Sequence, residues 1–302
     1  MDIIETKNYI KLVLVKEIFI PVFLLTFFYS SFAQSQTDNK LKKKIEALIL
    51  DFHGEIGVYV KDIKRNKVVD IRGDSVFPTA SMVKIPILIG VMDKIERGEL
   101  QYHEELFYKD SLLYEGVDIL GSFKNEQKID LSKVVMLMLT MSDNTASLWL
   151  QSLAGTGTRI NIILDSLGFR NTRVNSRTPG REEYRSVYGW GQTSPREMAG
   201  ILEKIYKHEV INVKSSDKML RLLSRNYWDE QALSVIPPTI KVFSKNGAVD
   251  ASRSEVLLVN APGNPYVFCI CTKNNKDESW TSENEAWVLI RKISAVLWDH
   301  FN

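Results

Sequence analysis

The segment from Phe77 to Gly98 constrains the fold most, because it joins a long apolar stretch to two reactive side chains. Its sequence, FPTASMVKIPILIGVMDKIERG, has the composition and length of a buried helix that ends near Gly98. Ser81 and Lys84 stand three residues apart near its start, so a helix places them on one face. A partly desolvated, neutral lysine amine can take the proton of a serine hydroxyl and make the oxygen nucleophilic. The pattern S-x-x-K is short, however, and is also common at helix starts where the lysine is solvated.

The overall composition is that of a globular protein long enough for one or two domains. The chain has 302 residues, of which 44% are hydrophobic and 25% charged, and its formal net charge is +2. Basic residues are interspersed with acidic ones, and neither a basic run nor an RNA-binding motif is present. We therefore expect no nucleic-acid partner, and any partner must be recognised by a specific site.

The first 33 residues have the pattern of a secretory signal. Three lysines precede the uncharged run Ile18–Phe28, and Ser31-Phe32-Ala33 fits an A-x-A-like cleavage site before Gln34. The run is shorter than the roughly 20 residues that a membrane-spanning helix needs. We expect residues 1–33 to be removed on export, which gives a periplasmic or secreted protein with no other membrane segment. An uncleaved N-terminal anchor is the alternative.

Cysteine and histidine usage argues against disulfide and metal chemistry. The only cysteines are Cys269 and Cys271. On a strand they point to one face, at a separation poorly suited to a disulfide, and we expect two buried free thiols. The four histidines show no metal-ligand spacing, so we expect no metal and no other cofactor.

Hydrophobic periodicity predicts strands near both ends of the chain and helices throughout. Apolar residues recur at helical spacing over 41–52, and alternation over 56–63 and 67–71 predicts a hairpin. Pro86 removes one backbone donor from the Ser81 helix, so we expect irregular or 3₁₀-like first turns. The other expected helices are 131–141, 145–153, 158–167, 196–207, 215–223 and 283–301, and the other expected strands are 239–244, 255–259 and 266–272.

These elements predict an α+β fold in which a helical part interrupts an antiparallel sheet. Residues 99–225 contain expected helices and no convincing strand. We predict a discontinuous α/β domain from residues 34–76 and 226–302, whose sheet is flanked by the terminal helices. An all-helical domain over 77–225 is inserted in it, with Ser81 at the junction of the two.

Two further motifs turn the short S-x-x-K pattern into a specific signal. The sequence S-D-N occupies 142–144 and K-N-G occupies 245–247; Ser142 follows Ser81 by 61 residues, and Lys245 follows Ser142 by 103. In this order, S-x-x-K, S-D-N and K-T-G mark class A β-lactamases and penicillin-binding proteins. Over essentially its whole mature region the chain resembles this family of serine hydrolases, and the resemblance implies the β-lactamase-like fold.

The resemblance also implies a role for each matching residue. Ser81 is the implied nucleophile, Lys84 belongs to its proton relay, and Ser142 passes a proton toward the leaving nitrogen. Backbone N–H groups of Ser81 and Ala248 form the implied oxyanion hole. The implied substrate-binding residues are Asn144 beside the amide side chain of the substrate, Lys245, Asn246 and Arg253 near its carboxylate, and Gly247 and Ala248 on the strand that it approaches.

Two positions depart from the family pattern. The third motif reads K-N-G, so the Asn246 amide stands where a hydroxyl usually contacts the substrate carboxylate. In class A enzymes a glutamate within an E-x-x-x-N pattern activates the water that releases the acyl group, and Thr178 occupies its place here. Glu182 and Glu183 follow within the long aperiodic segment 168–194, which is a functional or mobile loop or a surface insertion. They are candidate bases if this loop folds differently, and solvated surface glutamates otherwise.

The resemblance implies an exported β-lactamase-like hydrolase that is acylated at Ser81 and hydrolyses the β-lactam amide, in antibiotic resistance or β-lactam catabolism. The alternative is a penicillin-interacting or D-Ala-D-Ala peptidase-like protein with slow or absent deacylation. A scaffold without chemistry is disfavoured, because all the reactive motif residues are retained. In both cases we expect a small-molecule substrate, either a β-lactam or a peptidoglycan-like amide, and a monomer.

Overall fold

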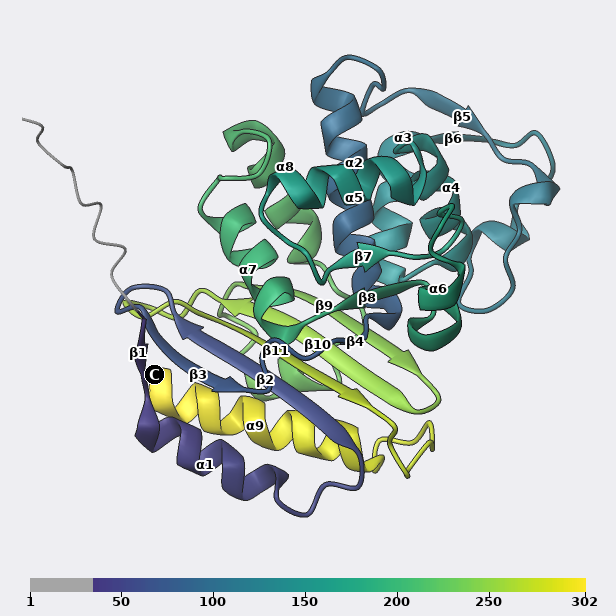
Figure 1. Ribbon diagram of the computed structural model, residues 1–302. Helices are drawn as coiled ribbons and strands as arrows, with labels where there is room; N and C mark the ends of the chain where they lie inside the picture. Colours follow the sequence, from purple (N-terminus) through teal and green to yellow (C-terminus); the bar gives the residue numbers. More distant parts are fainter. Residues whose placement is uncertain (1–34) are drawn as a thin grey trace, which may run out of the picture. The chain divides into compact units, whose positions relative to one another are not determined.

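A six-stranded sheet forms the centre of the computed structural model, which describes residues 35–302 (Figure 1). The predicted signal at 1–33 lies outside the described residues. The strand order is β1-β3-β2-β11-β10-β9, and neighbouring strands are antiparallel except for β1 beside β3. The strands are β1 (Gln36–Thr37), β2 (Glu55–Asp62), β3 (Lys67–Ile71), β9 (Val242–Val249), β10 (Ser252–Val259) and β11 (Tyr266–Lys273).

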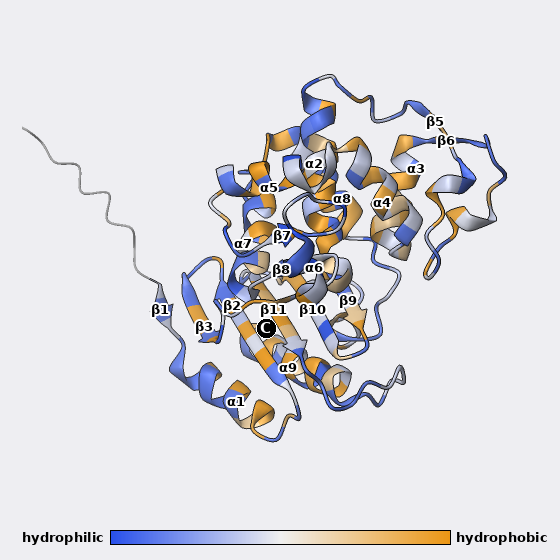
Figure 2. Ribbon diagram, turned by 45° about the vertical axis from the view of Figure 1, so that its right-hand side comes forward, coloured by the Kyte–Doolittle hydropathy of each residue, from blue (hydrophilic) through white to orange (hydrophobic). Residues whose placement is uncertain are grey.

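Helices cover both faces of this sheet. On one face lie α1 (Asn39–Ile49) and α9 (Glu285–Phe301), side by side, and on the other α7 (Pro195–Tyr206) packs against β2, β10 and β11. Successive strand residues point to opposite faces, so Leu257 joins the core under α1 and α9 while Val256 joins the core on the helical side. Figure 2 shows the central strands largely in the hydrophobic colour, as expected for a sheet buried on both faces.

The second layer of helices is built around α2 (Lys84–Glu96). Every residue of α2 from Lys84 to Met92 is buried, which explains why the sequence here is apolar on all sides. A 3₁₀ turn, Ala80–Val83, precedes α2, so the predicted irregular start is confirmed. The surrounding helices are α3 (Leu131–Met136), α4 (Asn144–Leu153), α5 (Thr156–Ser166) and α8 (Val213–Leu223). None of the described helices combines the length and apolarity that a membrane span requires.

The α+β architecture is confirmed, but the prediction of no strand within 99–225 was wrong. The strands β5 (Glu105–Phe107) and β6 (Lys128–Asp130) pair with each other, and β7 (Arg173–Val174) and β8 (Gly191–Thr193) join β4 (Phe77–Pro78) in a small sheet. Strands of two or three residues are too short to carry a detectable alternation, and their pairing partners are distant in sequence. The segment 168–194 also contains a helix, α6 (Glu182–Tyr188), instead of being aperiodic throughout.

The expected strand 239–244 was misplaced. It begins at Val242 and runs through the K-N-G motif to Val249. The preceding Pro237 and Ile240 form a turn, in which the Ile240 N–H donates to the Pro237 carbonyl oxygen at 2.9 Å, so this part of the predicted strand cannot pair. The consequence for the site is that Lys245, Asn246 and Gly247 all lie in the edge strand of the sheet.

Candidate active site

Ser81 lies in the 3₁₀ turn before α2, and two glycines allow this turn to pack tightly. A Cβ atom at Gly247 would lie 2.5 Å from the Thr79 carbonyl oxygen and 2.8 Å from the Ser81 nitrogen. One at Gly191 would lie 2.7 Å from Thr79 Oγ1. Any side chain at Gly247 would therefore displace the turn that carries Ser81. The glycine of the K-N-G motif accommodates the protein's own backbone, a role that the sequence interpretation missed.

Lys84 connects the first two motifs. Its Nζ lies 3.1 Å from Ser81 Oγ, 2.9 Å from Ser142 Oγ, 2.6 Å from the Ser142 carbonyl oxygen and 3.1 Å from Asn144 Oδ1. The side chain is fully buried. The amine thus bridges the two serine hydroxyls that the sequence singled out, which is the geometry a proton relay requires.

Burial lowers the pKa of Lys84 well below its ordinary value, and the nearby positive charge of Lys245 lowers it further, while the Asp143 carboxylate opposes both. Desolvation has this effect because an ammonium group loses its hydration shell in the core. A neutral amine has a free lone pair and can accept a proton from the Ser81 hydroxyl.

Ser142 is held in a strained backbone conformation. It has φ = +61° and follows a π-helical turn, Leu137–Met141. A non-glycine residue in the left-handed region costs free energy, and the bond from Lys84 Nζ to the Ser142 carbonyl oxygen helps to hold it. Neither the strain nor the π-helical turn has a signature in the sequence.

Asp143 supports the site without touching Ser81. Its Oδ1 caps α4 by accepting from the Ala146 N–H at 2.7 Å, and its Oδ2 accepts from Ile119 N at 2.5 Å and Leu120 N at 3.1 Å. The carboxylate therefore fixes the loop that passes over α4. No role for this middle residue of the S-D-N motif follows from the sequence alone.

Lys245 and Asn246 lie on β9 at the edge of the site. The Lys245 amine is buried and donates to the Asn246 carbonyl oxygen at 3.0 Å and to Asn246 Oδ1 at 3.2 Å. Burial lowers the pKa of Lys245 to about 7, against a smaller opposing effect of the Glu255 carboxylate. The charge of this lysine is consequently sensitive to pH near neutrality.

Glu255 is a buried acid that sequence reasoning missed. It lies on β10 opposite Asn246, and its Oε2 accepts from the Ala232 N–H at 2.9 Å, while Oε1 has no hydrogen-bond partner. Burial raises the pKa of this carboxyl to about 7. A glutamate inside an apolar strand sequence was the available signal.

Arg253 is also buried, and its guanidinium is bound by backbone carbonyl groups. Nη1 donates to the carbonyl oxygens of Val249, Asp250 and Ser252, and Nη2 donates to those of Glu278 (3.4 Å) and Ser279 (2.9 Å). Arg253 thereby ties the β9–β10 hairpin to the segment before α9. Its assignment to the substrate carboxylate stays a prediction.

In the segment with the candidate deacylating residues, the Arg181 guanidinium binds the side-chain amides of two other residues. Arg181 Nη2 donates to Asn175 Oδ1 at 2.9 Å and to Gln192 Oε1 at 2.7 Å. Thr178 is buried, and its hydroxyl donates to the Ser176 carbonyl oxygen at 2.9 Å.

The two candidate glutamates begin α6. Glu182 and Glu183 are solvent-exposed and line neither of the two pockets at Ser81. No described contact joins either carboxylate to Ser81 or Lys84. Their assignment as deacylating bases therefore stays a prediction.

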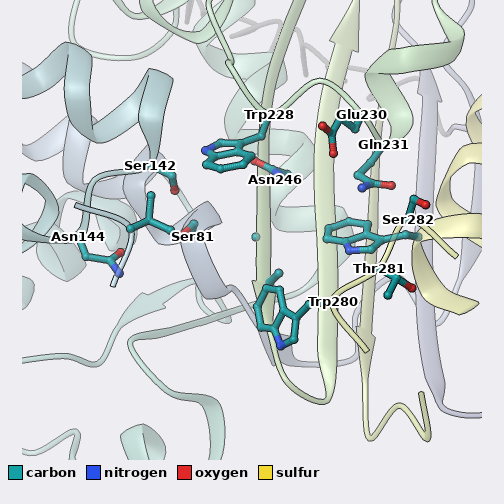
Figure 3. A pocket seen from close by; sticks show the side chains of 14 residues that line it. Ser81, Ser142, Asn144, Trp228, Glu230, Gln231, Asn246, Trp280, Thr281 and Ser282 are labelled. Carbon is teal, nitrogen blue, oxygen red and sulfur yellow. The ribbon is translucent and has the colours of Figure 1, made fainter. Parts of the chain in front are cut away.

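Two pockets meet at Ser81. The larger, about 450 Å³, runs from Ser81, Ser142 and Asn144 past Asn246 toward Trp228, Glu230 and Trp280 (Figure 3). The smaller, about 330 Å³, is lined on its far side by residues of the loop before α3 and by the end of α6, among them Tyr114, Tyr188 and Trp190. In the described part of the chain no group of three or more His, Cys, Asp and Glu side chains is placed to hold a metal ion. Both cysteines are free and buried, as expected.

This fold, with a serine and a buried lysine between the sheet and the helical layer, defines a serine hydrolase related to class A β-lactamases. A family model described as the "Beta-lactamase enzyme family" matches residues 40–301, and the chain belongs to that family. It is 22% identical to β-lactamase VEB-1 of Pseudomonas aeruginosa, over 93% of this chain and 96% of that protein.

Solved structures share the fold. The structure of PBP-A superposes with a TM-score of 0.78 at 24% identity, covering 88% of this chain and 97% of that one. The extended-spectrum β-lactamase TLA-3 superposes with a TM-score of 0.77 at 21% identity, covering 86% and 98%. Similarity at this level establishes the architecture, while the chemistry must be argued from the residues of the site.

Proposed function

We propose that the protein opens β-lactams by forming an acyl-enzyme at Ser81 and then hydrolyses it. The observation that carries the proposal is the buried Lys84 amine, with Ser81 Oγ at 3.1 Å and Ser142 Oγ at 2.9 Å. A desolvated amine between two hydroxyls can move a proton from the nucleophile to the leaving group.

The proposed acylation proceeds in three steps. The neutral Lys84 amine accepts the Ser81 proton as Oγ bonds to the lactam carbonyl carbon, and the backbone N–H groups of Ser81 and Ala248 stabilise the oxyanion. The C–N bond then breaks, and the nitrogen takes its proton from Ser142 Oγ. Lys84 returns a proton to Ser142, so the amine is neutral again and the acyl group remains on Ser81.

A second function, penicillin binding with slow release, has its own support. Thr178 has no ionisable group, and the exposed Glu182 and Glu183 line neither pocket at Ser81, so none of the three candidate positions brings a carboxylate to the acylated serine. A variant of PBP-A, which shares the fold, is described as an acyl-enzyme complex with penicillin G. On this proposal the protein would act like a D-Ala-D-Ala peptidase that β-lactams acylate for long times.

One experiment separates these functions. Purified residues 34–302 are mixed with a chromogenic cephalosporin, and the intact mass is measured over time, with Ser81→Ala as the control. Fast turnover without a lasting adduct supports hydrolysis. An adduct that persists and is absent in Ser81→Ala supports slow release. Neither turnover nor adduct would overturn both functions.

We also propose that the protein is exported and acts as a monomer outside the cytoplasm. The support is the basic and then apolar pattern of residues 1–33. N-terminal sequencing of the protein from fractionated cells tests export: a mature chain that starts near Gln34 agrees with it, whereas an intact Met1 in the cytoplasmic fraction contradicts it. Size-exclusion chromatography with light scattering tests the monomer.

A further inference from the structure

The far end of the larger pocket has a composition that the catalytic groups do not explain. Beyond Asn246 it is lined by three tryptophans and one carboxylate, together with small polar groups: Trp228, Trp280, Trp287, Glu230, Gln231, Thr281 and Ser282. Figure 3 shows Trp228 and Trp280 on either side of this region, with Glu230 at its edge and Ser81 and Ser142 at the opposite end. Among all fourteen residues that line the pocket, Glu230 is the only one with a charged side chain.

The aromatic rings are fixed in place. Trp228 Nε1 donates to the Met141 carbonyl oxygen at 3.0 Å, which ties the indole to the residue before Ser142. The Trp280 side chain is held from behind, because the Arg253 guanidinium carbon lies 4.5 Å from its ring centroid and 5.8 Å from that of Trp287. Trp280 nevertheless stays 65% exposed. Together with Trp228 and Trp287, the exposed Trp280 ring gives the pocket a continuous aromatic lining, and exposed apolar patches of this kind mark binding sites.

The N–H groups of the two cations near this region already donate to oxygen atoms of the protein. The Arg253 guanidinium is bound by carbonyl oxygens, and the Lys245 amine donates to the carbonyl and amide oxygens of Asn246. Neither side chain lines the pocket. The pocket therefore presents aromatic faces and the Glu230 carboxylate, and this combination attracts organic cations, because the ring faces carry negative potential.

The position of this region decides which part of a substrate it meets. Penicillins and cephalosporins carry their carboxylate on the leaving-group half, and the role proposed for Asn246 is to contact that carboxylate. Asn246 lies on the same side of Ser81 as the tryptophans. Asn144 and the smaller pocket lie on the acyl side. We propose that the region formed by Trp228, Trp280, Trp287 and Glu230 selects substrates with a planar cationic substituent on the leaving-group side. This inference rests on the proposed acylation of Ser81 and specifies its substrate class.

The test compares two cephalosporins that share a thienylacetyl side chain and differ at the 3′ carbon, where one carries pyridinium and the other acetoxy. For each substrate, the acylation rate constant divided by the dissociation constant is measured by stopped-flow absorbance at 260 nm. The ratio of the two values cancels effects on the catalytic groups. The variants are Trp280→Leu, which keeps an apolar side chain without an aromatic face, and Glu230→Gln, which removes the charge. Glu96→Gln, at the far end of α2, is the charge-matched control.

We expect the acylation rate constant over the dissociation constant for the pyridinium substrate, divided by the same quantity for the acetoxy substrate, to fall in both variants. The fall should be about 3- to 10-fold in Trp280→Leu and about 2- to 5-fold in Glu230→Gln. Glu96→Gln should leave it unchanged, and Trp280→Phe should retain most of it. An unchanged ratio in either Trp280→Leu or Glu230→Gln, with acylation intact, overturns this inference alone. If neither cephalosporin acylates the unmodified protein, the proposed function fails, and the inference fails with it.

Discussion

The acylation site and the segment 175–190 differ in the burial and the hydrogen-bond contacts of their polar side chains. Around Ser81, a fully buried lysine contacts two hydroxyls, a carbonyl and an amide, and its surroundings hold Ser142 in a strained conformation. In the segment, Arg181 and its amide partners close the chain, while the nearby glutamates stay in solvent. The groups proposed for acylation thus contact one another, whereas the described residues 175–190 bring no carboxylate into either pocket at Ser81.

Replacing Lys84 by methionine should have the largest effect. We expect the acylation rate constant to fall about 10³-fold, because the buried amine that contacts the Ser81 hydroxyl is lost. Stability should change little or increase, since an apolar side chain of similar length replaces a buried amine. Stopped-flow kinetics and thermal unfolding measure the two effects. Lys94→Met, on the same helix outside both pockets, is the control, and equal acylation by both variants would contradict the role of Lys84.

Adding a carboxylate to the segment 175–190 should increase the rate of deacylation. Thr178→Glu is expected to speed deacylation about 10-fold or more, because it supplies a general base at the position where the resemblance to class A enzymes implies a glutamate. The lifetime of the adduct, followed by intact mass, measures the change. Thr178→Gln has the same size without the charge. If both variants release the acyl group at the same rate, the position does not reach the acylated serine.

Substrate binding should depend on pH through Lys245. Because its pKa is about 7, the amine is charged below that pH and becomes neutral as the pH rises through it. We expect the dissociation constant of a carboxylate-bearing substrate to increase about 3- to 5-fold from pH 6 to pH 8. The pKa of Lys84 is lowered as well, so the dissociation constant and the acylation rate constant must be measured separately. Lys245→Arg stays charged and should flatten the binding profile, and a flat profile in the unmodified protein would exclude the titration.

The smallest effect is expected at the two exposed glutamates. Glu182→Gln and Glu183→Gln should each change the deacylation rate less than about 2-fold, because neither carboxylate lines a pocket at Ser81. Burst kinetics with a chromogenic cephalosporin give the rate. A 10-fold slower release in either variant would show that α6 moves its carboxylate to the acyl group during turnover.

Much of the fold was predictable because its patterns are local. Helices such as α5 and α9 and the β2–β3 hairpin follow from periodicity over ten or so residues. Their first and last residues were predicted to within two positions. The short strands β7 and β8 were missed, because each exists only through pairing with partners far away in sequence. The start of β9 was misjudged, since the turn at Pro237 depends on backbone contacts and not on the apolar pattern.

By itself, the sequence determined that Ser81, Lys84, Ser142 and Lys245 belong to one serine-hydrolase site, because three short motifs in a fixed order carry that information. Only the tertiary structure decided the environment of these groups. Burial lowers the pKa of Lys84. The absence of a Cβ atom at Gly247 lets the turn that carries Ser81 pack closely against β9. Lys84 contacts a segment 58 to 60 residues away, and Gly247 packs on a turn more than a hundred residues before it, so no local pattern encodes desolvation or close approach.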